Sequence, residues 1–207
     1  SERSRGLGDV YKRQGYNGGP VDVMIILEAF GTGLIVEPYI PNIVLSGNLV
    51  SKLGTKEQKD SILPNLLDGD MQLAFAFSEP QSRFDLNDVT TSAEEDGDGF
   101  KLNGFKSVVM NGPAADKLII SARTSGSQLD KNGISLFIVD RDTKGVSLRD
   151  YSNIDGSKAS ELTLENVVLT KEAILGDLGK AFSTIEEVVN LATLAISAEA
   201  IGIMQKM

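Results

Sequence analysis

The spacing of the apolar residues changes twice along this chain of 207 residues. Residues 15–70 show helical spacing, residues 71–175 mostly alternate, and a helical pattern resumes at about Gly179 and continues to Met207. A segment that carries one of these periods does not settle stably into the other kind of element. We therefore predict an α+β fold: an N-terminal helical domain, a middle antiparallel β-barrel or sandwich domain, and the first helix of a C-terminal helical bundle.

The same changes give the predicted domain boundaries. We expect a partial N-terminal helical domain over residues 15–70, a β domain over 71–175, and the first helix of a truncated bundle over 176–207. Residues 1–14 are polar and locally basic and show neither period. We interpret them as an artefactual tail, with a mobile native terminus as the alternative.

The predicted β domain contains short strands separated by turn residues. The expected strands are residues 72–77, 89–94, 100–102, 106–110, 117–124, 134–140, 146–151 and 161–169. Two hairpin turns are expected, one at residues 96–99 and one at Asn103-Gly104, because Asn, Asp and Gly tolerate positive φ. In the helical part, Thr55 and Gln58 have the spacing of a capping box.

Composition excludes several kinds of chemistry. The chain has no His and no Cys, so imidazole catalysis, disulfides and thiolate metal sites are absent. Its net charge of −9 repels phosphate backbones and anionic lipids, so we expect no nucleic-acid and no membrane partner. No apolar run reaches the roughly eighteen residues of a membrane-spanning helix, and no signal-peptide pattern opens the chain. We therefore expect a cytoplasmic protein.

Two segments of the β region carry a distinctive pattern. Residues 73–86 read LAFAFSEPQSRFDL, an apolar run that stops at Ser-Glu-Pro and turns toward Asp85. Residues 103–116 read NGFKSVVMNGPAAD and close on Asn111, Gly112 and Asp116. Considered alone, the first segment is also typical of a core strand that ends in a turn.

In this order and at this spacing, the two segments resemble the flavin-binding middle domain of acyl-CoA dehydrogenases. There, an A-x-x-x-[ST]-E-P loop ending in Asp and a G-x-K-x-x-x-x-N-G hairpin hold the isoalloxazine ring between them. The resemblance covers residues 15–207 and leaves residues 1–14 outside the family. It implies FAD as cofactor, an acyl-CoA substrate, and an electron-transferring flavoprotein or similar acceptor as partner. It also implies a homo- or hetero-oligomer of related subunits.

The resemblance also assigns cofactor-binding residues. Phe75, Phe77 and Ser78 would border the flavin, with the Ser78 hydroxyl as a hydrogen-bond donor. The backbone of Val108, Val109 and Met110 would contact it from the second segment. The family often has Trp at the position of Val108 and Thr at that of Met110. Loss of the aromatic wall would forfeit about 0.5–1.5 kcal/mol of stacking. Lys106 and Asn111 are interpreted as structural.

The first loop departs from the family's usual G-A-G-S-D. Phe84 replaces a small Ser that approaches the pyrophosphate or the acyl chain, and Arg83 is predicted to compensate by pairing with phosphate. The alternative for Arg83 is a surface ion pair with Asp85 or Asp88. These departures resemble a divergent branch of the family such as the small subunit of pimeloyl-CoA dehydrogenase, whose partner is a second, different dehydrogenase subunit.

No catalytic base is assigned in this chain. In some family members the base lies in the helix that corresponds to residues 179–207, where this chain has Ala192 beside Thr193. Glu186, Glu187 and Glu199 are interpreted as a solvated helix face, and the base is expected beyond Met207. We therefore predict part of an FAD-dependent acyl-CoA dehydrogenase that is inactive by itself. The alternatives are a flavin-dependent oxidase or monooxygenase of the same fold and a non-catalytic subunit.

Overall fold

The computed structural model describes residues 19–207, so the predicted tail at residues 1–14 lies outside the described part of the chain. The helical elements before the sheet are α2 (Pro20–Gly33), the π-helical segment η2 (Ile40–Gly47), α3 (Asn48–Leu53) and α4 (Lys56–Asp68). The predicted capping box opens α4. Gln58 N donates to Thr55 Oγ1 at 3.2 Å, and Thr55 N donates to Gln58 Oε1 at 3.0 Å.

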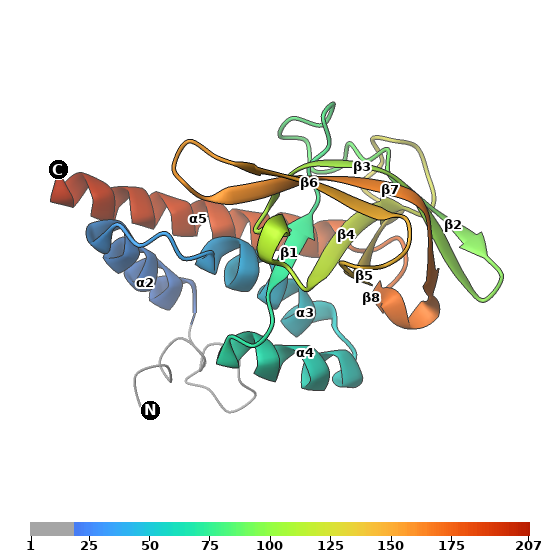
Figure 1. The fold of residues 1–207 in the computed structure, drawn as a ribbon, viewed down its shortest axis with the longest axis horizontal. Helices are drawn as coiled ribbons and strands as arrows, with labels where there is room; N and C mark the ends of the chain where they lie inside the picture. The colour runs from blue at the N-terminus through green and yellow to red at the C-terminus, as the bar shows by residue number, and fades with distance from the viewer. Residues whose placement is uncertain (1–18) are drawn as a thin grey trace.

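The strands form one eight-stranded sheet (Figure 1). They are β1 (Leu73–Ala76), β2 (Ser92–Asp96), β3 (Gly99–Met110), β4 (Lys117–Arg123), β5 (Ile134–Asp140), β6 (Val146–Ser152), β7 (Lys158–Thr170) and β8 (Ile174–Leu175). The order is β6-β7-β3-β2-β4-β5-β8, with β1 paired to β4. The prediction of an antiparallel sheet needs correction at β4, since β1 and β2 both pair with it in parallel.

The prediction of a hairpin turn at Asn103-Gly104 is wrong, whereas the turn between β2 and β3 is confirmed. Residues 99–110 form the single strand β3, which pairs antiparallel with β7 and shifts register between Leu102 and Gly104. The partner strand is 13 residues long and pairs on both sides of this irregularity. The Asn-Gly dipeptide therefore continues the strand instead of making a turn, and the β-bulge at this point is on β7, where Glu165 and Asn166 stand opposite Asn103. Short 3₁₀ turns, η3 (Gly112–Ala114) and η4 (Lys171–Ala173), follow β3 and β7.

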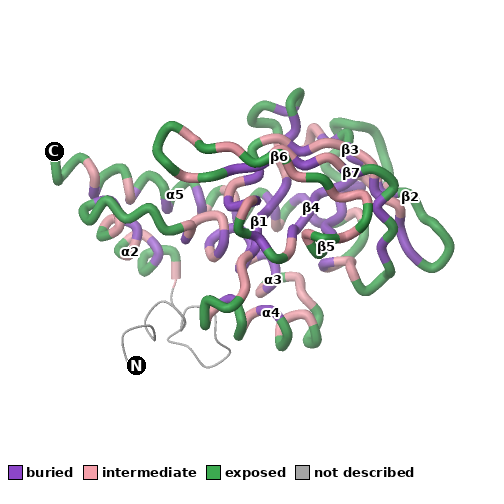
Figure 2. Tube along the Cα trace, viewed as in Figure 1, coloured by how far each residue is buried: buried purple, intermediate pink, exposed green. Residues whose placement is uncertain are grey.

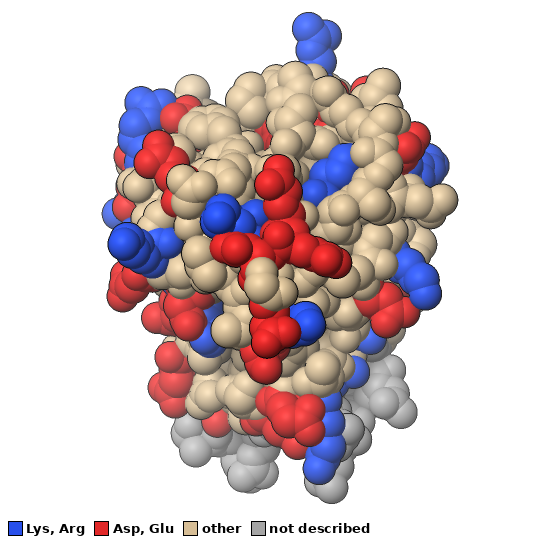
Figure 3. Space-filling view, turned by 90° about the vertical axis from the view of Figure 1, so that its right-hand side faces the viewer, with Lys and Arg blue, Asp and Glu red and all other residues tan. Residues whose placement is uncertain are grey.

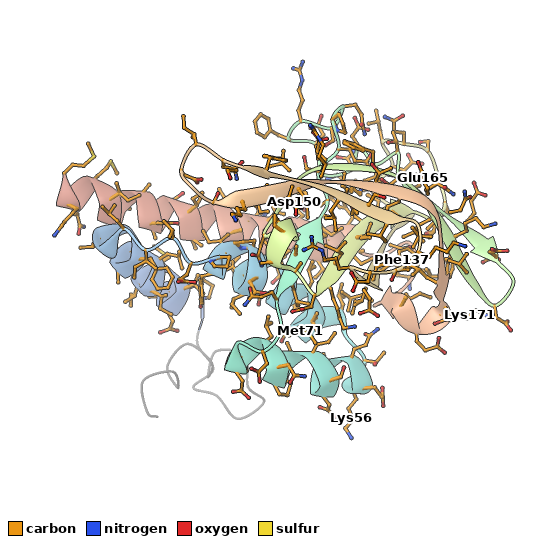
Figure 4. The ribbon with its side chains drawn as sticks, in the orientation of Figure 1. Lys56, Met71, Phe137, Asp150, Glu165 and Lys171 are labelled. Atoms are coloured by element: carbon orange, nitrogen blue, oxygen red, sulfur yellow. The ribbon has the colours of Figure 1, made fainter. Side chains whose placement is uncertain are left out.

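Two hydrophobic cores lie on opposite faces of the strands around β4. Ile119 belongs to the core shared with the helices, and its neighbours Leu118 and Ile120 belong to the core inside the β region. In the second core the rings of Phe100 and Phe137 lie 5.3 Å apart between centroids, and Figure 4 labels Phe137 within the strands. Figure 2 shows buried segments concentrated around β1 and β4. Because β4 is covered on both faces, it is apolar without alternation.

The last element, α5 (Phe182–Lys206), packs beside α2 (Figure 1). Its buried residues lie on one face at spacings of three and four: Phe182, Ile185, Val188, Ala192, Ala195, Ala198 and Gly202. By length and composition alone α5 could cross a membrane, since it has 25 residues and a mean hydropathy of 1.5 in an 18-residue window. The chain still has no unbroken apolar run of that length, because polar residues are scattered along α5, and the helix meets the criterion through its mean hydropathy.

The turn between β2 and β3 carries an acidic surface. Figure 3 shows acidic side chains gathered on the face that contains this hairpin. The exposed acidic residues of the hairpin are Glu94, Glu95, Asp96 and Asp98. Lys101 and Lys171 each pair with one of these carboxylates, Asp96 at 3.2 Å and Asp98 at 3.7 Å. The negative net charge is therefore concentrated in part on one end of the sheet.

Candidate functional site

The two motif segments lie side by side and antiparallel. At one end, the Asn111 side-chain amide donates to Leu73 O at 3.1 Å. At the other end, Ser107 N donates to Ser78 O at 2.9 Å. Between these contacts, β1 and the residues that follow it run along the last part of β3. Asn111 therefore has the structural role that the sequence predicted.

A buried ion pair joins the segments more strongly. Lys106 Nζ lies 2.7 Å from Glu79 Oε1, and both side chains are completely buried. Lys106 Nζ also donates to Ser121 Oγ at 3.0 Å. The Glu of Ser-Glu-Pro and the Lys of Gly-Phe-Lys are thus partners across 27 positions of sequence. Sequence reasoning predicted a structural role for Lys106 but did not find its partner.

Glu79 also receives hydrogen bonds from three neighbours. Thr91 N donates to Oε1 at 3.1 Å, Thr90 N donates to Oε2 at 2.8 Å, and the Gln81 amide donates to Oε2 at 2.9 Å. The Thr90 hydroxyl donates to the same oxygen. Burial by itself raises the pKa of Glu79, but the charge of Lys106 and these hydrogen bonds outweigh it and hold the pKa below its usual value. Burial lowers the pKa of Lys106, and the charge of Glu79 opposes that shift.

This network predicts how stability depends on pH. A carboxyl group with a depressed folded-state pKa stabilises the fold above its unfolded-state pKa of about 4.3, and this stabilisation is lost as the pH falls toward the folded value. Lys106 faces Glu79 directly, and Arg123 is the other cation that acts on it. We expect the free energy of unfolding, measured with urea between about pH 6 and pH 3, to fall on acidification. The Glu79→Gln/Lys106→Met variant should show a smaller fall, and an equal fall in both proteins would contradict this assignment.

The residues after Lys106 form a bulge that turns outward. The β3–β7 register shifts between Lys106 and Val109. Val108 adopts φ of 52°, and its side chain is 52% exposed. A β-branched residue with positive φ is strained, and such strain gathers at functional sites. The strain therefore marks the Ser107–Val108 bulge as a candidate contact surface.

Gly104 of the motif is required by a close contact. A Cβ at this position would lie 2.5 Å from Thr91 Oγ1 and 2.7 Å from the Thr91 Cα. Thr91 also donates its backbone N–H to Glu79, so the collision would displace the ion-pair network. We expect Gly104→Ala to lower the free energy of unfolding by about 2 kcal/mol in urea titrations. Gly97→Ala is a test of the positive-φ penalty without a collision, since Gly97 has φ of 59° and open space around it. An equal loss in both variants would count against the contact.

The loop after Glu79 forms a tight turn that exposes its tip. Ser82 Oγ accepts from Glu79 N at 3.1 Å and donates to Glu79 O at 2.9 Å. Arg83 follows with φ of 48°, and the Phe84 side chain is 96% exposed. Among the described residues no ion pair joins Arg83 to Asp85 or Asp88, so that alternative for Arg83 is wrong. Arg83 and Phe84 therefore point to solvent, and their predicted role toward substrate stays a prediction.

Sequence reasoning missed Arg123, whose guanidinium donates hydrogen bonds to the backbone at the end of this loop. Its guanidinium donates to six backbone carbonyls, those of Asn87, Val89, Ser125, Gln128, Asp130 and Asn132, at 2.8–3.3 Å. These carbonyls belong to two loops that precede β2 and β5. An Arg at the end of a predicted strand gives no sequence signal for this role. The carbonyls that it binds are backbone groups, which every residue has, and they lie in two loops that are separated in the sequence.

The predicted cofactor-binding residues lie in two kinds of environment. Phe77, Ser78 and Met110 are half-buried, and Phe77 stacks on the buried Phe75 at 4.8 Å between ring centroids. Val109 is completely buried in the inner core, so only its backbone can face a ligand. The partly exposed side chains of Phe77, Val108 and Met110, with the nearby hydroxyls of Ser78 and Ser107, define what we call the platform surface.

The platform surface fits a flavin ring. Phe77 and Met110 pack on the edge of the core shared with the helices and supply an apolar wall. The Ser78 hydroxyl has, among the hydrogen bonds of the described residues, only a 3.5 Å contact with Ser107 Oγ. It therefore keeps donor capacity for the polar edge of a ring. An apolar wall beside a hydroxyl donor is an arrangement that suits one face and one polar edge of an isoalloxazine.

The described part of α5 offers no positioned base at the predicted site. Ala192 is buried, and the Thr193 hydroxyl donates to Val189 O at 2.9 Å.

Glu186 and Glu187 lie on an exposed face of α5, as predicted, whereas Glu199 does not. Glu186 and Glu187 pair with Lys131 at 3.8 Å and Lys52 at 2.8 Å. Glu199 is half-buried, and burial, together with Asp155, raises its pKa.

Known proteins are similar to this chain in sequence. Residues 74–167 match the family model described as acyl-CoA dehydrogenase, middle domain. A 3-(aryl)acrylate reductase of Clostridium sporogenes is 38% identical over 168 residues, which cover 80% of this chain and 44% of that protein. The caffeyl-CoA reductase-Etf complex subunit CarC of Acetobacterium woodii is 32% identical over 197 residues, covering 92% of this chain and 52% of that protein.

The fold is similar to a solved structure as well. Butyryl-CoA dehydrogenase from Megasphaera elsdenii superimposes with a TM-score of 0.87 at 26% identity, covering 97% of this chain and 55% of the other. The chain spans about half the length of the curated relatives it matches. The similarity includes the helices, the sheet and α5, and the predicted fold is confirmed.

Proposed function

Because this chain belongs to the acyl-CoA dehydrogenase family, we propose that it forms the FAD platform of an enzyme that oxidises an acyl-CoA between its α and β carbons. The observation that carries the proposal is the platform surface itself. Two segments distant in sequence, joined by Lys106 and Glu79, present an apolar wall beside the Ser78 hydroxyl.

The residues of the platform would hold and orient the cofactor. The Ser78 hydroxyl would donate a hydrogen bond to the ring, and the half-buried Phe77 and Met110 would exclude water from one side. Val108 would contact the ring at its edge, where its backbone is already bent outward. When bound, FAD supplies an acceptor for the hydride that leaves the β carbon. The base for the α proton is not assigned to any described residue.

A second candidate is the reverse reaction, reduction of an α,β-unsaturated acyl-CoA. The 38% and 32% identical relatives described above are both named reductases, and this observation favours it. The flavin-dependent oxidase or monooxygenase and the non-catalytic subunit remain further alternatives. An electron-transferring flavoprotein as partner, an oligomer of related subunits and a cytoplasmic location belong to the proposal too, supported for the partner by the Etf complex to which one relative belongs.

The experiment is to purify the full-length protein that contains this chain and to record its visible absorption spectrum. We expect bound FAD, and we expect an acyl-CoA panel to bleach it under anaerobic conditions. With chemically reduced flavin, an enoyl-CoA panel should restore the colour, and recolouring that proceeds further than bleaching at matched concentrations would favour the reductase. A protein that takes up no FAD would contradict the proposal and support the non-catalytic alternative. Bleaching only by a nicotinamide donor, followed by rapid reoxidation with oxygen, would support the monooxygenase.

A further inference from the structure

We propose that the buried Glu79–Lys106 pair is a positioning device that shapes the platform surface before the cofactor binds. It would do so by holding the bulge at Ser107 and Val108 in its outward conformation. The inference rests on the proposed function, since it concerns the surface assigned to FAD. Glu79 and Lys106 themselves do not touch the cofactor in this proposal.

The pairing of β3 with β7 requires a bulge after Lys106. Lys106 lies opposite Leu162 on β7, and Val109 lies opposite Ser160. Residues opposite each other point to the same face, so Lys106 and Val109 both point inward with the buried Leu162 and Ser160. On β7 one residue separates the inward pair, but on β3 two residues separate Lys106 from Val109. A regular strand cannot place residues three apart on one face, so the chain must bulge between them.

The two inward-pointing side chains, Lys106 and Val109, are held in place by different interactions. The Val109 side chain is fixed in the inner core by hydrophobic packing. Lys106 carries a charged group into the interior, and the inward position of that group depends on Glu79 and Ser121. Without these partners a buried ammonium group would be unpaired, and this would favour a slip of β3 that turns residue 106 outward. The strained φ of Val108 would be relieved by the same slip.

The ion pair also connects the bulge to the first motif segment, residues 73–86. Glu79 follows Ser78 directly, and Ser107 follows Lys106 directly, so one ion pair fixes both residues. The backbone bond from Ser107 N to Ser78 O, at 2.9 Å, closes a small ring of contacts around the pair. The backbone N–H groups of Thr90 and Thr91 hold the carboxylate from the other side. Movement of the pair would therefore shift both hydroxyls of the platform surface together.

The first test needs no substitution. In the full-length protein freed of flavin, amide hydrogen exchange measured by NMR should show Ser107 N–H to be protected, because the bulge is formed before FAD is added. The Phe105 N–H is a neighbouring reference within the same strand. Exchange of Ser107 that is fast in the flavin-free protein and slows only when FAD is added would overturn the proposal.

The second test separates positioning from stability. Glu79→Gln/Lys106→Met replaces the pair by neutral side chains of similar size, so this variant should remain folded where either single variant fails. We expect its thermal midpoint to stay near that of the parent, its Ser107 protection to fall, and its dissociation constant for FAD to rise at least about tenfold. The surface pair Arg149–Glu161, joined at 2.7 Å between β6 and β7, provides the control Arg149→Met with unchanged FAD affinity.

The outcomes distinguish this inference from the proposed function. A parent protein that binds no FAD contradicts the proposed function, while the loss of Ser107 protection in the double variant still tests the bulge. A double variant that retains both parental protection and parental FAD affinity would overturn the inference, even if the enzyme is a flavoprotein. A double variant whose bound FAD shows a shifted visible spectrum, with an unchanged thermal midpoint, would support it.

Discussion

Lys106→Met is expected to lower the free energy of unfolding by about 3–5 kcal/mol, because it leaves the carboxylate of Glu79 buried without its cation. Both side chains are completely buried at a distance of 2.7 Å. The hydrogen bonds from Thr90, Thr91 and Gln81 remain, so the carboxylate keeps some compensation. Urea or guanidinium unfolding at neutral pH measures the loss, with the m-value as a check on two-state behaviour.

Two further variants show whether the loss comes from the unpaired charge. Glu79→Gln/Lys106→Met removes both charges and should recover most of the loss, because a buried pair replaced by neutral groups of similar volume is often close to neutral in stability. Arg149→Met breaks a pair in which the Arg side chain is 76% exposed, and should change stability by less than about 1 kcal/mol. Equal losses in Lys106→Met and the double variant would contradict the assignment.

Gly31→Ala is expected to lower the free energy of unfolding by about 3 kcal/mol, because α2 and α5 touch through their backbones. A Cβ at Gly31 would lie 2.0 Å from Glu199 O on α5. The contact is reciprocal, since a Cβ at Gly202 would lie 2.0 Å from Glu28 O on α2. A carbonyl in a helix cannot move alone, so the two helices must separate. Chemical denaturation measures the loss, and Gly202→Ala should show a similar one.

The control for this contact lies two residues along the same helix. A Cβ at Gly33 would meet only the side chain of Ile35, at 3.2 Å, and that side chain can rotate away. We therefore expect Gly33→Ala to change stability by less than about 1 kcal/mol, with the helix propensity of Ala acting in its favour. A loss in Gly33→Ala as large as that in Gly31→Ala would contradict the assignment of the Gly31→Ala loss to the α2–α5 contact.

Local signals were sufficient where the interaction they predict is local. The Thr55–Gln58 capping box joins residues three positions apart, and the turn between β2 and β3 joins adjacent strands, so both could be predicted. The Asn103-Gly104 dipeptide carries an equally strong turn signal, yet it lies inside β3. Pairing with the 13-residue β7 stabilises one continuous strand more than the local turn would.

The sequence by itself determined the order of helices and strands and, through its two motifs, the family. It also identified Lys106 as a structural residue. Only the tertiary structure decided that Glu79 is its partner, that Ser107 and Val108 form an outward bulge, and that Arg83 and Phe84 point to solvent. The physical reason is one of range. Hydrophobic period and turn chemistry act within a few residues, whereas a buried charge is stable only when folding brings an opposite charge from a distant segment.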